Sequence, residues 1–515
     1  MSMNNQGRVT APNEISSAKF ESFSGNKALD QATKLIFETG SFKKTGIDFP
    51  KPKGIKYRLG GLEQTKNIEL PGLSEPETLR HYVRLSQKNY AIDLGVYPLG
   101  SCTMKHNPRL NEKVARLPGF SDVHPLQPIA TVQGALELMY ELSNWLTKLC
   151  NMPAVALTPK AGAHGELCGM MTIRARLDAD GNSHKRRVFV PESAHGTNPA
   201  TAVQCGFFVD ELPANDKGCI DMDVLRLKIS DLGSDNDIAG IMLTNPNTCG
   251  LFESDIIEIS ELIHNAGGYF YCDGANFNAL VGRVRPGDLG VDAMHINLHK
   301  TFSTPHGGGG PGSGPTVLSD ALKDYAPIPY VVKDKSGRFD LVEDINDISM
   351  GRLCAFHGQM GMYTRALSYM MSHGSDGLKQ ATEDAVLNAN YILASLSDLM
   401  TPAYSGHCMH EVLFDDTFLQ NTGVDTLDFA KAMIDEGYHP MTMYFPLVVH
   451  GAMLIEPTES ESKYELDRFI TTMRGLANRA KSGDIKSFKS APQHSPTKRV
   501  DETLAARKPV LRYEP

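Results

Sequence analysis

The sequence has no long apolar run. Among its 515 residues, no stretch of about 18 or more consecutive apolar side chains occurs, which excludes an ordinary transmembrane helix. The N-terminal segment lacks the apolar stretch of a secretion signal, and Glu14 and Glu21 argue against an organelle-targeting peptide. We therefore expect no association with a membrane.

A block of basic residues is equally absent. The chain has 51 Lys and Arg residues against 60 Asp and Glu residues, which gives a formal net charge of −9. An acidic chain without a basic patch binds nucleic acid poorly. We therefore expect no nucleic-acid partner.

Paired cysteines are also missing from the pattern. The nine cysteines are scattered singly, and no C-x-x-C motif occurs. An odd, unpatterned set in a large chain is typical of reduced thiols, which predicts a cytoplasmic location.

Three motif-like patterns do not develop into sites. The spacing of His295 and His299 resembles a metal pair, but it falls on a predicted strand and lacks the Glu of H-E-x-x-H. Residues 407–410 (HCMH) are interpreted as the flank of a strand. The glycines at 307–312 formally fit a dinucleotide fingerprint, but Pro311 interrupts any helix there. We expect no metal site.

The middle of the chain alternates strand-like and helix-like segments. Short β-branched or aromatic runs predict strands at 187–190, 238–244, 269–272 and 294–300. Apolar periodicity and capping signals predict helices at 74–87, 132–149, 167–177 and 256–263. This alternation predicts an α/β fold with a mostly parallel sheet and helices on both of its faces.

The composition divides the chain into four expected parts. Its length suggests roughly two to four domains. We expect an N-terminal arm and helix at 1–90, a large domain at 91–335, a smaller α+β domain at 336–480, and a basic, polar tail at 481–515.

Polar loops follow four of the predicted strands, and ligands in parallel α/β sheets bind beyond such strand ends. The loops lie at 193–198, 244–247, 273–276 and 297–301. They bring His195, Asp273 and Lys300 toward one crevice. A partly desolvated lysine can form a Schiff base with an aldehyde, an acid can hold a pyridine nitrogen protonated, and an imidazole can lie over the ring. These are the groups that pyridoxal 5′-phosphate (PLP) requires.

A phosphate cradle is predicted at residues 161–166 (AGAHGE), just before a helix. Small residues such as Gly162 and Ala163 let backbone N–H groups approach an anion at a helix N-terminus. The glycine-rich stretch at 307–314 would leave room for a flat cofactor or a partner chain.

Each signal also has an ordinary structural interpretation. A lysine at a strand end is usually a solvated surface residue, and Asp-Gly after a strand is more often a turn. A loop histidine is more often packed than catalytic, and a glycine run can be a flexible linker. These interpretations weaken together, because the cradle, His195, Asp273 and Lys300 follow one another at successive strand ends.

Longer motifs identify a family. The sequence resembles the glycine decarboxylase P-protein of the glycine cleavage system, and more closely subunit 2 of its two-subunit form. The resemblance covers about nine-tenths of the chain. It rests on LSQKNYAIDLGVYPLGSCTMKHNPR from Leu85, AGAHGE from Ala161, SAHGTNPA from Ser193, LTNPNTCGLFE from Leu243, DGANFNA from Asp273, NLHKTFSTPHGGGGPGSGP from Asn297, IEPTESES from Ile455 and DETLAARKPVLR from Asp501.

The resemblance implies a fold-type-I PLP enzyme with an aspartate-aminotransferase-like large domain and a smaller C-terminal domain. Lys300 matches the Schiff-base lysine, Asp273 the partner of the pyridine nitrogen, and His195 the ring-stacking histidine. The further cofactor contacts that it implies are Gly162, Ala163, Thr197, Ala275, Asn297 and His299.

The implied activity is decarboxylation of glycine with transfer of the aminomethyl group to the lipoyl arm of H-protein. The implied assembly is a heterotetramer with glycine decarboxylase subunit 1. Three alternatives remain open. The chain could be a different PLP enzyme, such as an amino-acid decarboxylase or a hydroxymethyltransferase, or a non-catalytic subunit. A nicotinamide oxidoreductase is the weakest alternative, because no strand–GxGxxG–helix unit exists.

Overall fold

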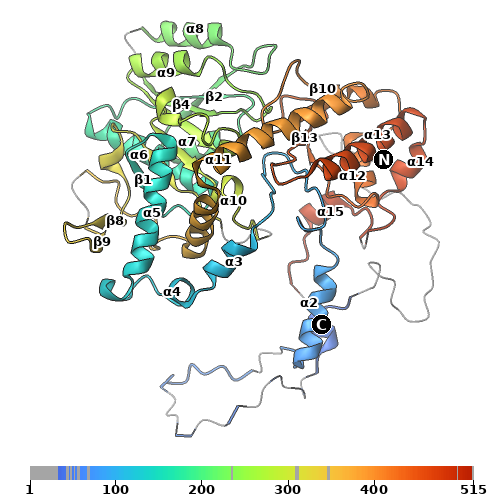
Figure 1. The fold of residues 1–515 in the computed structure, drawn as a ribbon, viewed down its shortest axis with the longest axis horizontal. Coiled ribbons are helices and arrows are strands. Elements are labelled where there is room, and N and C mark those ends of the chain that lie inside the picture. Colours follow the sequence, from blue (N-terminus) through green and yellow to red (C-terminus); the bar gives the residue numbers. More distant parts are fainter. Residues whose placement is uncertain are drawn as a thin grey trace.

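A computed structural model gives the fold of the chain (Figure 1). It describes residues 33–512 except 42–43, 45, 47–48, 51–52, 55–57, 67–69, 234–235, 308–311, 345–347 and 496. Half of the glycine-rich stretch predicted at 307–314 and the first 32 residues of the expected arm therefore lie outside the described residues.

The large domain is built on a seven-stranded sheet. Its strand order is β1 (Ala154–Ala156), β7 (Thr316–Leu318), β6 (Ala293–Ile296), β5 (Tyr269–Gly274), β4 (Ile238–Thr244), β2 (Arg187–Pro191) and β3 (Phe208–Leu212). β7 runs antiparallel to its two neighbours, and the other adjacent pairs are parallel. Every residue of β4 is buried, as expected for a parallel strand covered on both faces.

Helices cover both faces of this sheet. On one face, Phe189, Ile241 and Phe270 share a core with α5 (Gln133–Cys150), α8 (Met222–Leu232) and α9 (Ile256–Asn265). On the other, Val188, Met242 and their neighbours pack against α6 (Gly162–Ala179) and α7 (Thr197–Gln204). Successive strand residues thus alternate between the two cores, as the pleat requires.

A smaller domain contains a four-stranded antiparallel sheet. Its strand order is β10 (Thr401–Pro402), β11 (Val412–Asp415), β13 (Met453–Ile455) and β12 (Thr442–Met443). Its core includes Phe414, Phe429, Phe469 and Phe488, from β11, α12 (Thr426–Asp435), α13 (Lys463–Lys481) and α14 (Ile485–Ser490).

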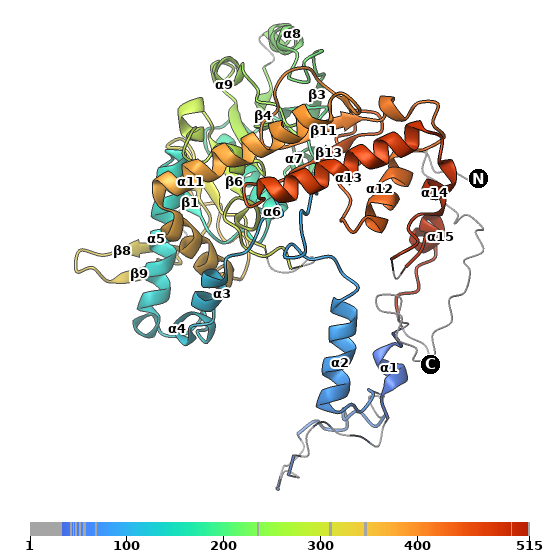
Figure 2. The same ribbon diagram turned by 45° about the vertical axis from the view of Figure 1, so that its right-hand side comes forward.

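The remaining elements are short or peripheral. They are α1 (Ile36–Thr39), α2 (Glu75–Ser86), α3 (Arg109–Ala115), α4 (Pro118–Ser121), α10 (Leu298–Thr301), α15 (Glu502–Arg507), the hairpin of β8 (Tyr330–Lys333) and β9 (Phe339–Val342), and single 3-10 turns at Ile129–Thr131, Phe277–Ala279, Pro286–Leu289, Lys323–Tyr325 and Thr417–Leu419. Figures 1 and 2 show α2 standing away from the two domains. None of the helices in the described ranges combines the length and apolarity needed to span a bilayer.

The helix α11 (Met360–Leu396) joins the two cores (Figure 2). It bends at Gly374, whose φ of 66° is non-helical. Tyr363, before the bend, packs in the large-domain core, and Leu396, near the far end, packs in the small-domain core. We propose that the large domain extends into the first half of α11; the other predicted domain boundaries stay predictions.

The segment before α3 crosses to the small domain. Val96 belongs to the small-domain core, and Leu99 forms a β-bridge with Ile455. Residues 96–105 therefore run between the two domains, although the sequence analysis assigned them to the large domain by their position in the chain.

Most predicted elements are confirmed, and one is wrong at its end. Ser74 caps α2 with a capping box. The strand predicted at 294–300 ends earlier, at Ile296, and Lys300 lies in the helical turn α10. The alternation of His and apolar residues fits a strand, but the Asn297 carbonyl accepts N–H bonds from Lys300 and Thr301 and so starts the turn.

Candidate active site

The carboxyl ends of three adjacent strands meet at one edge of the large sheet. In the strand register, Thr244 of β4 pairs with Asp273 of β5, and Asp273 pairs with His295 of β6. Lys300 follows β6 by one turn. The predicted strand-end residues Asp273 and Lys300 therefore belong to neighbouring strand ends, where ligands bind in this class of fold.

Asp273 is almost fully buried but well supplied with hydrogen-bond donors. Its Oδ1 accepts from the Ala275 N–H at 2.9 Å, and its Oδ2 accepts from Asn198 Nδ2 at 3.1 Å. Burial alone would raise the pKa of Asp273. The His295 ring, the Ala275 N–H and the Lys300 ammonium outweigh burial and hold that pKa below its ordinary value. Asp273 is therefore set to remain a carboxylate.

His295 contacts Asp273, a role that the sequence analysis missed. Its Nε2 lies 3.5 Å from Asp273 Oδ1, and its Nδ1 lies 2.6 Å from the Tyr271 hydroxyl. Burial lowers the pKa of His295, which favours the neutral ring. The contact follows from the β5–β6 register, and only knowledge of that register could have revealed it.

A second buried carboxyl group, Glu166 of α6, lies behind Asp273. Asn198 Nδ2 donates to Glu166 Oε2 at 3.0 Å as well as to Asp273, so one amide bridges the two carboxyl groups. The Thr197 and Thr201 hydroxyls donate to Glu166 at 2.6 and 3.4 Å. Burial and the nearby charge of Asp273 raise the pKa of Glu166 to about 7.

His195 lies at the exposed side of the same network. It follows β2, and its Nδ1 lies 2.8 Å from Thr197 Oγ1. Its ring meets the edge of Phe445, a residue of the small domain, with centroids 5.8 Å apart. His195 therefore stands where the two domains face each other.

The N-terminus of α6 is open toward the site. No side chain caps it, so the N–H groups of its first turn, which includes Gly162 and Ala163, are available to an anion. A Cβ atom at Gly162 would come within 2.8 Å of Asn297 Oδ1, which is itself buried without a hydrogen-bond partner. The backbone thus approaches Asn297 as only glycine allows.

These features fit PLP. The open helix end suits its phosphate, the Asp273 carboxylate suits its ring nitrogen, and the Lys300 amine suits its aldehyde. Asn297, three residues before Lys300, keeps its buried Oδ1 without a hydrogen-bond partner, so this oxygen could accept from a group bound beside the lysine.

Two more histidines line the Lys300 side. His299 and His306 meet edge to face, with ring centroids 5.2 Å apart. Burial, together with the nearby His306 ring and the Lys300 charge, lowers the pKa of His299 to about 3. Burial and the Lys300 charge lower the pKa of His306 to about 4. Both rings are therefore neutral near pH 7 and add no competing positive charge beside the lysine.

The small domain contributes a buried acidic wall. The Ser101 N–H donates to Glu411 at 2.8 Å, and the Thr103 N–H donates to Glu456 at 2.9 Å. His410 Nε2 lies 3.7 Å from Glu456 Oε1. The Lys300 charge works to lower the pKa of Glu411 and of His410. The lysine therefore faces this wall as well as Asp273.

Among the residues that the structure describes, the candidate metal ligands that lie close together belong to this wall. His410, Glu411 and Glu456 each offer a ligand atom within 4.8 Å of the others. However, Glu411 already accepts hydrogen bonds from Ser101 and Asn276, whereas the His410 nitrogens and Glu456 Oε1 have no partner. Two uncommitted groups are fewer than the about three or four protein ligands of a transition-metal site. We assign no metal to the wall.

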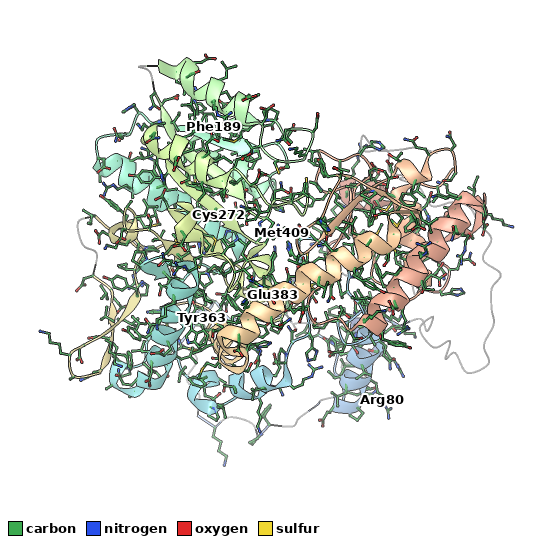
Figure 3. The ribbon with its side chains drawn as sticks, turned by 45° about the horizontal axis from the view of Figure 1, so that its top comes forward. Arg80, Phe189, Cys272, Tyr363, Glu383 and Met409 are labelled. Carbon is green, nitrogen blue, oxygen red and sulfur yellow. The ribbon has the colours of Figure 1, made fainter. Side chains whose placement is uncertain are left out.

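Figure 3 labels two residues that adjoin the site. Cys272, which precedes Asp273, lies in the large-domain sheet, and Met409, which precedes His410, lies at the junction of the domains. Met409 packs against the large-domain core. The interpretation of residues 407–410 as a strand flank is confirmed, because β11 begins at Val412, but their acidic neighbours were not foreseen.

The other predicted cofactor contacts form hydrogen bonds within the chain. The Ala275 N–H and the Thr197 hydroxyl already serve Asp273 and Glu166. His299 Nδ1 accepts from the Ser313 N–H at 3.4 Å. Their roles toward a cofactor stay predictions.

Comparisons with known sequences identify relatives of the chain. A family described as "Glycine dehydrogenase, C-terminal domain" matches residues 381–499. A protein of Caulobacter vibrioides named "Probable glycine dehydrogenase (decarboxylating) subunit 2" is 64% identical, over 100% of this chain and 98% of its own. A protein of the same name from Pyrococcus furiosus is 46% identical, over 93% of this chain and 95% of its own.

Solved structures show the same fold. An inhibitor-bound glycine decarboxylase (P-protein) of the glycine cleavage system superposes with a TM-score of 0.69 at 19% identity, covering 81% of this chain and 93% of that one. Glutamate decarboxylase of Lactobacillus brevis gives 0.61 at 15% identity, covering 84% and 96%. The predicted fold-type-I architecture, with its mostly parallel large-domain sheet, is confirmed. The extent of the sequence identity shows that this chain belongs to the family of glycine dehydrogenase (decarboxylating) subunit 2.

Proposed function

We propose that the chain is the PLP-carrying subunit of a glycine dehydrogenase (aminomethyl-transferring). It would decarboxylate glycine and pass the aminomethyl group to the lipoyl arm of H-protein, within the glycine cleavage system. The observation that carries the proposal is the meeting of Lys300, buried Asp273 and the open end of α6 at one edge of the sheet, in a chain 64% identical to a relative named for this activity.

The cofactor, when bound, would supply the electron sink that makes loss of CO2 from an amino acid possible. Lys300 would hold it through Nζ, and the N–H groups of Gly162 and Ala163 would bind its phosphate. His195 would lie over its ring. Asn297, which precedes the turn that presents Lys300, and His299, which lies in that turn, would confine it laterally.

Asp273 would hold a proton at the ring nitrogen. Its lowered pKa supports this role, because a carboxylate that stays ionised in a buried site stabilises a neighbouring N–H⁺. The neutral His299 and His306 rings would leave Lys300 as the principal cation on its side of the cleft.

The reaction also needs partners. The name subunit 2, shared by the relatives, implies a second subunit, and we propose glycine decarboxylase subunit 1 in a heterotetramer. Lipoylated H-protein would accept the aminomethyl group: a C–S bond would form, the S–S bond would break, and a proton from the glycine ammonium would end on the second sulfur. A cytoplasmic location stays a prediction.

Borohydride reduction tests the central residue. The purified chain with PLP should show the absorbance of a lysine-bound cofactor, and peptide mapping after reduction should find the pyridoxyl group on Lys300. Lys300→Ala should lose both the absorbance and glycine–bicarbonate exchange. Full activity in Lys300→Ala, or a label on another lysine, would contradict the proposal.

Exchange assays separate the alternatives. Glycine–bicarbonate exchange that rises with lipoylated H-protein and subunit 1 supports the proposed reaction. Equal turnover without H-protein would favour another PLP activity. A chain that binds no PLP and only stabilises its partner would be the non-catalytic subunit.

A further inference from the structure

Glu166 is a buried carboxyl group for which the proposed chemistry has no task. It lies on α6 and is only 3% exposed. A chain of short contacts leads from it to the cleft: Thr197 Oγ1 is 2.6 Å from Glu166 Oε1 and 2.8 Å from His195 Nδ1. The Thr197 hydroxyl therefore stands between a buried acid and the ring that is predicted to cover the cofactor.

The hydroxyl has one proton and cannot donate to both neighbours. When Glu166 is ionised, the Thr197 O–H donates to its Oε1, and Thr197 Oγ1 accepts the Nδ1–H of His195. When Glu166 carries a proton, its Oε1–H donates to Thr197 Oγ1, and the Thr197 O–H turns to a bare His195 Nδ1. The Thr197 N–H, 3.2 Å from His195 Nδ1, donates only to the bare nitrogen, so this bond is made when Glu166 is protonated and given up when Glu166 is ionised.

The proton has a defined place on Glu166. Oε2 already accepts from Asn198 Nδ2 and from the Thr201 hydroxyl. Among the hydrogen bonds of Glu166, Oε1 takes part only in the one with the Thr197 hydroxyl. A hydroxyl group can accept from a carboxylic acid as readily as it donates to a carboxylate. Protonation at Oε1 thus keeps every other bond of Glu166 intact.

We propose that Glu166, through the Thr197 hydroxyl, sets the tautomer of His195 and so makes His195 either a donor or an acceptor toward the cleft. With Glu166 protonated, His195 Nε2 carries the hydrogen and is a donor. With Glu166 ionised, His195 Nε2 is a bare acceptor. Glu166 and Thr197 are positioning residues that act through His195. The catalytic consequence rests on the function proposed above, but the hydrogen-bond switch does not.

Glu166 can change its charge in the working range of pH. Its pKa is raised to about 7, first by burial and then by the charge of Asp273. The titratable or charged groups that face it, directly or one contact away, are Asp273 and Tyr271 of β5, His295 of β6, His195 after β2 and Lys300 of α10. Binding a cationic ring nitrogen against Asp273 would weaken the repulsion and favour ionised Glu166.

Histidine NMR tests the switch on the full-length, cofactor-free chain. In ¹⁵N-histidine-labelled protein, two-bond ¹H–¹⁵N spectra distinguish the two tautomers from each other and from the doubly protonated ring. The His195 signals are assigned by their absence in His195→Phe. In wild type, the hydrogen of the singly protonated ring should move from Nε2 to Nδ1 as the pH rises through about 7, where Glu166 ionises.

Four variants isolate the relay. Glu166→Gln, whose amide donates as the protonated acid does, should keep the Nε2–H tautomer from pH 6 to 8.5. Thr197→Val should remove the pH dependence, and Thr197→Ser should restore it. Glu253→Gln changes a buried carboxyl group with similar partners, Asn247 and the Ile220 N–H, and should leave His195 as in wild type.

Two results would overturn the proposal. One is a wild-type His195 tautomer that does not change between pH 6 and 8.5; the other is a Glu166→Gln spectrum that titrates like wild type. Because the wild-type titration needs only His195→Phe, for assignment, poor folding of a Glu166 or Thr197 variant cannot hide the outcome. If the wild-type chain showed this pH-dependent change of the His195 tautomer but did not decarboxylate glycine, the result would count against the proposed function alone.

Discussion

Two pairs of buried carboxyl groups lie on opposite sides of the cleft, and they are held in different ways. On the large-domain side, Asp273 and Glu166 share the Asn198 amide and receive two threonine hydroxyls. On the small-domain side, Glu411 and Glu456 receive backbone N–H groups from the loop at 101–103.

The backbones that serve the two sides differ as well. Ser101 and Thr103 have φ values of 61° and 44°, which is uncommon for residues with a side chain. That conformation aims their N–H groups at Glu411 and Glu456. The large-domain pair is thus organised around side-chain protons that can move, whereas the small-domain pair fixes a strained loop against the cleft.

A third buried carboxyl group on the small-domain side has a cation. Lys105 Nζ lies 2.6 Å from Glu459 Oε1, and it also donates to Asn278 at 2.8 Å and to the Tyr369 hydroxyl at 3.3 Å. The Lys105 side chain is 2% exposed. This complete network ties residues 96–105 to both domains, so it should matter for stability more than any other group on that side.

Replacing Lys105 should therefore have the largest effect. Lys105→Met would leave Glu459 buried without its cation, and we expect the free energy of unfolding to fall by about 3–5 kcal/mol. Urea denaturation measures the loss. Lys463→Met, which breaks an exposed pair with Asp467, should leave the free energy of unfolding close to that of wild type. Equal losses in the two variants would contradict the distinction.

The next largest effect should fall on activity and not on stability. Asp273→Asn keeps the size of the side chain and an acceptor for the Ala275 N–H, but it removes the charge. We expect PLP still to bind and glycine–bicarbonate exchange to drop on the order of 10²-fold or more. An unchanged exchange rate would show that the large-domain pair does not hold the charge of the cofactor.

The sequence predicts the strand-end half of this site well. β4 and β5 are apolar runs closed by polar turns, so Asp273 could be placed at a strand end from local pattern alone. Lys300 was placed in the right loop, although the strand before it was extended too far. These local patterns are enough because ligands of parallel sheets bind beyond the carboxyl ends of the strands.

The rest of the site depends on register and on distant segments. His295 contacts Asp273 only because β5 and β6 pair in one register. Glu166 is reached through a helix packed on the sheet. Glu456 belongs to the other domain and lies more than a hundred residues from Thr103 in the sequence. Nothing in the sequence around Glu456 indicates that the Thr103 N–H is its donor.

The pH dependence of stability sharpens the comparison on the large-domain side. The pKa of Glu166 is about 7 in the folded chain against an ordinary value of 4.5, so the folded state binds the proton more tightly. Its contribution to stability is fully present below about pH 4.5 and is lost as the pH rises to about 7.

Glu166→Gln should remove this loss. The variant should match wild type near pH 4.5 and exceed it at pH 8 by on the order of 2 kcal/mol in the free energy of unfolding. Urea denaturation of both chains without cofactor, at several pH values, gives the difference curve. A difference that does not change with pH would mean that Glu166 is not the titrating group.

The smallest effect is expected for the small-domain pair, where two substitutions of one residue separate charge from hydrogen bonding. Glu456→Gln keeps an oxygen for the Thr103 N–H and places an amide beside the His410 nitrogens, which now have no partner. It should change the free energy of unfolding by less than about 1 kcal/mol, because the lost charge had no cation.

Glu456→Ala leaves the Thr103 N–H buried without an acceptor and should cost about 1–3 kcal/mol. Urea denaturation at pH 7 compares them. If Gln destabilised the chain as much as Ala, the charge of Glu456 itself would be needed, and the small-domain pair would resemble the large-domain pair after all.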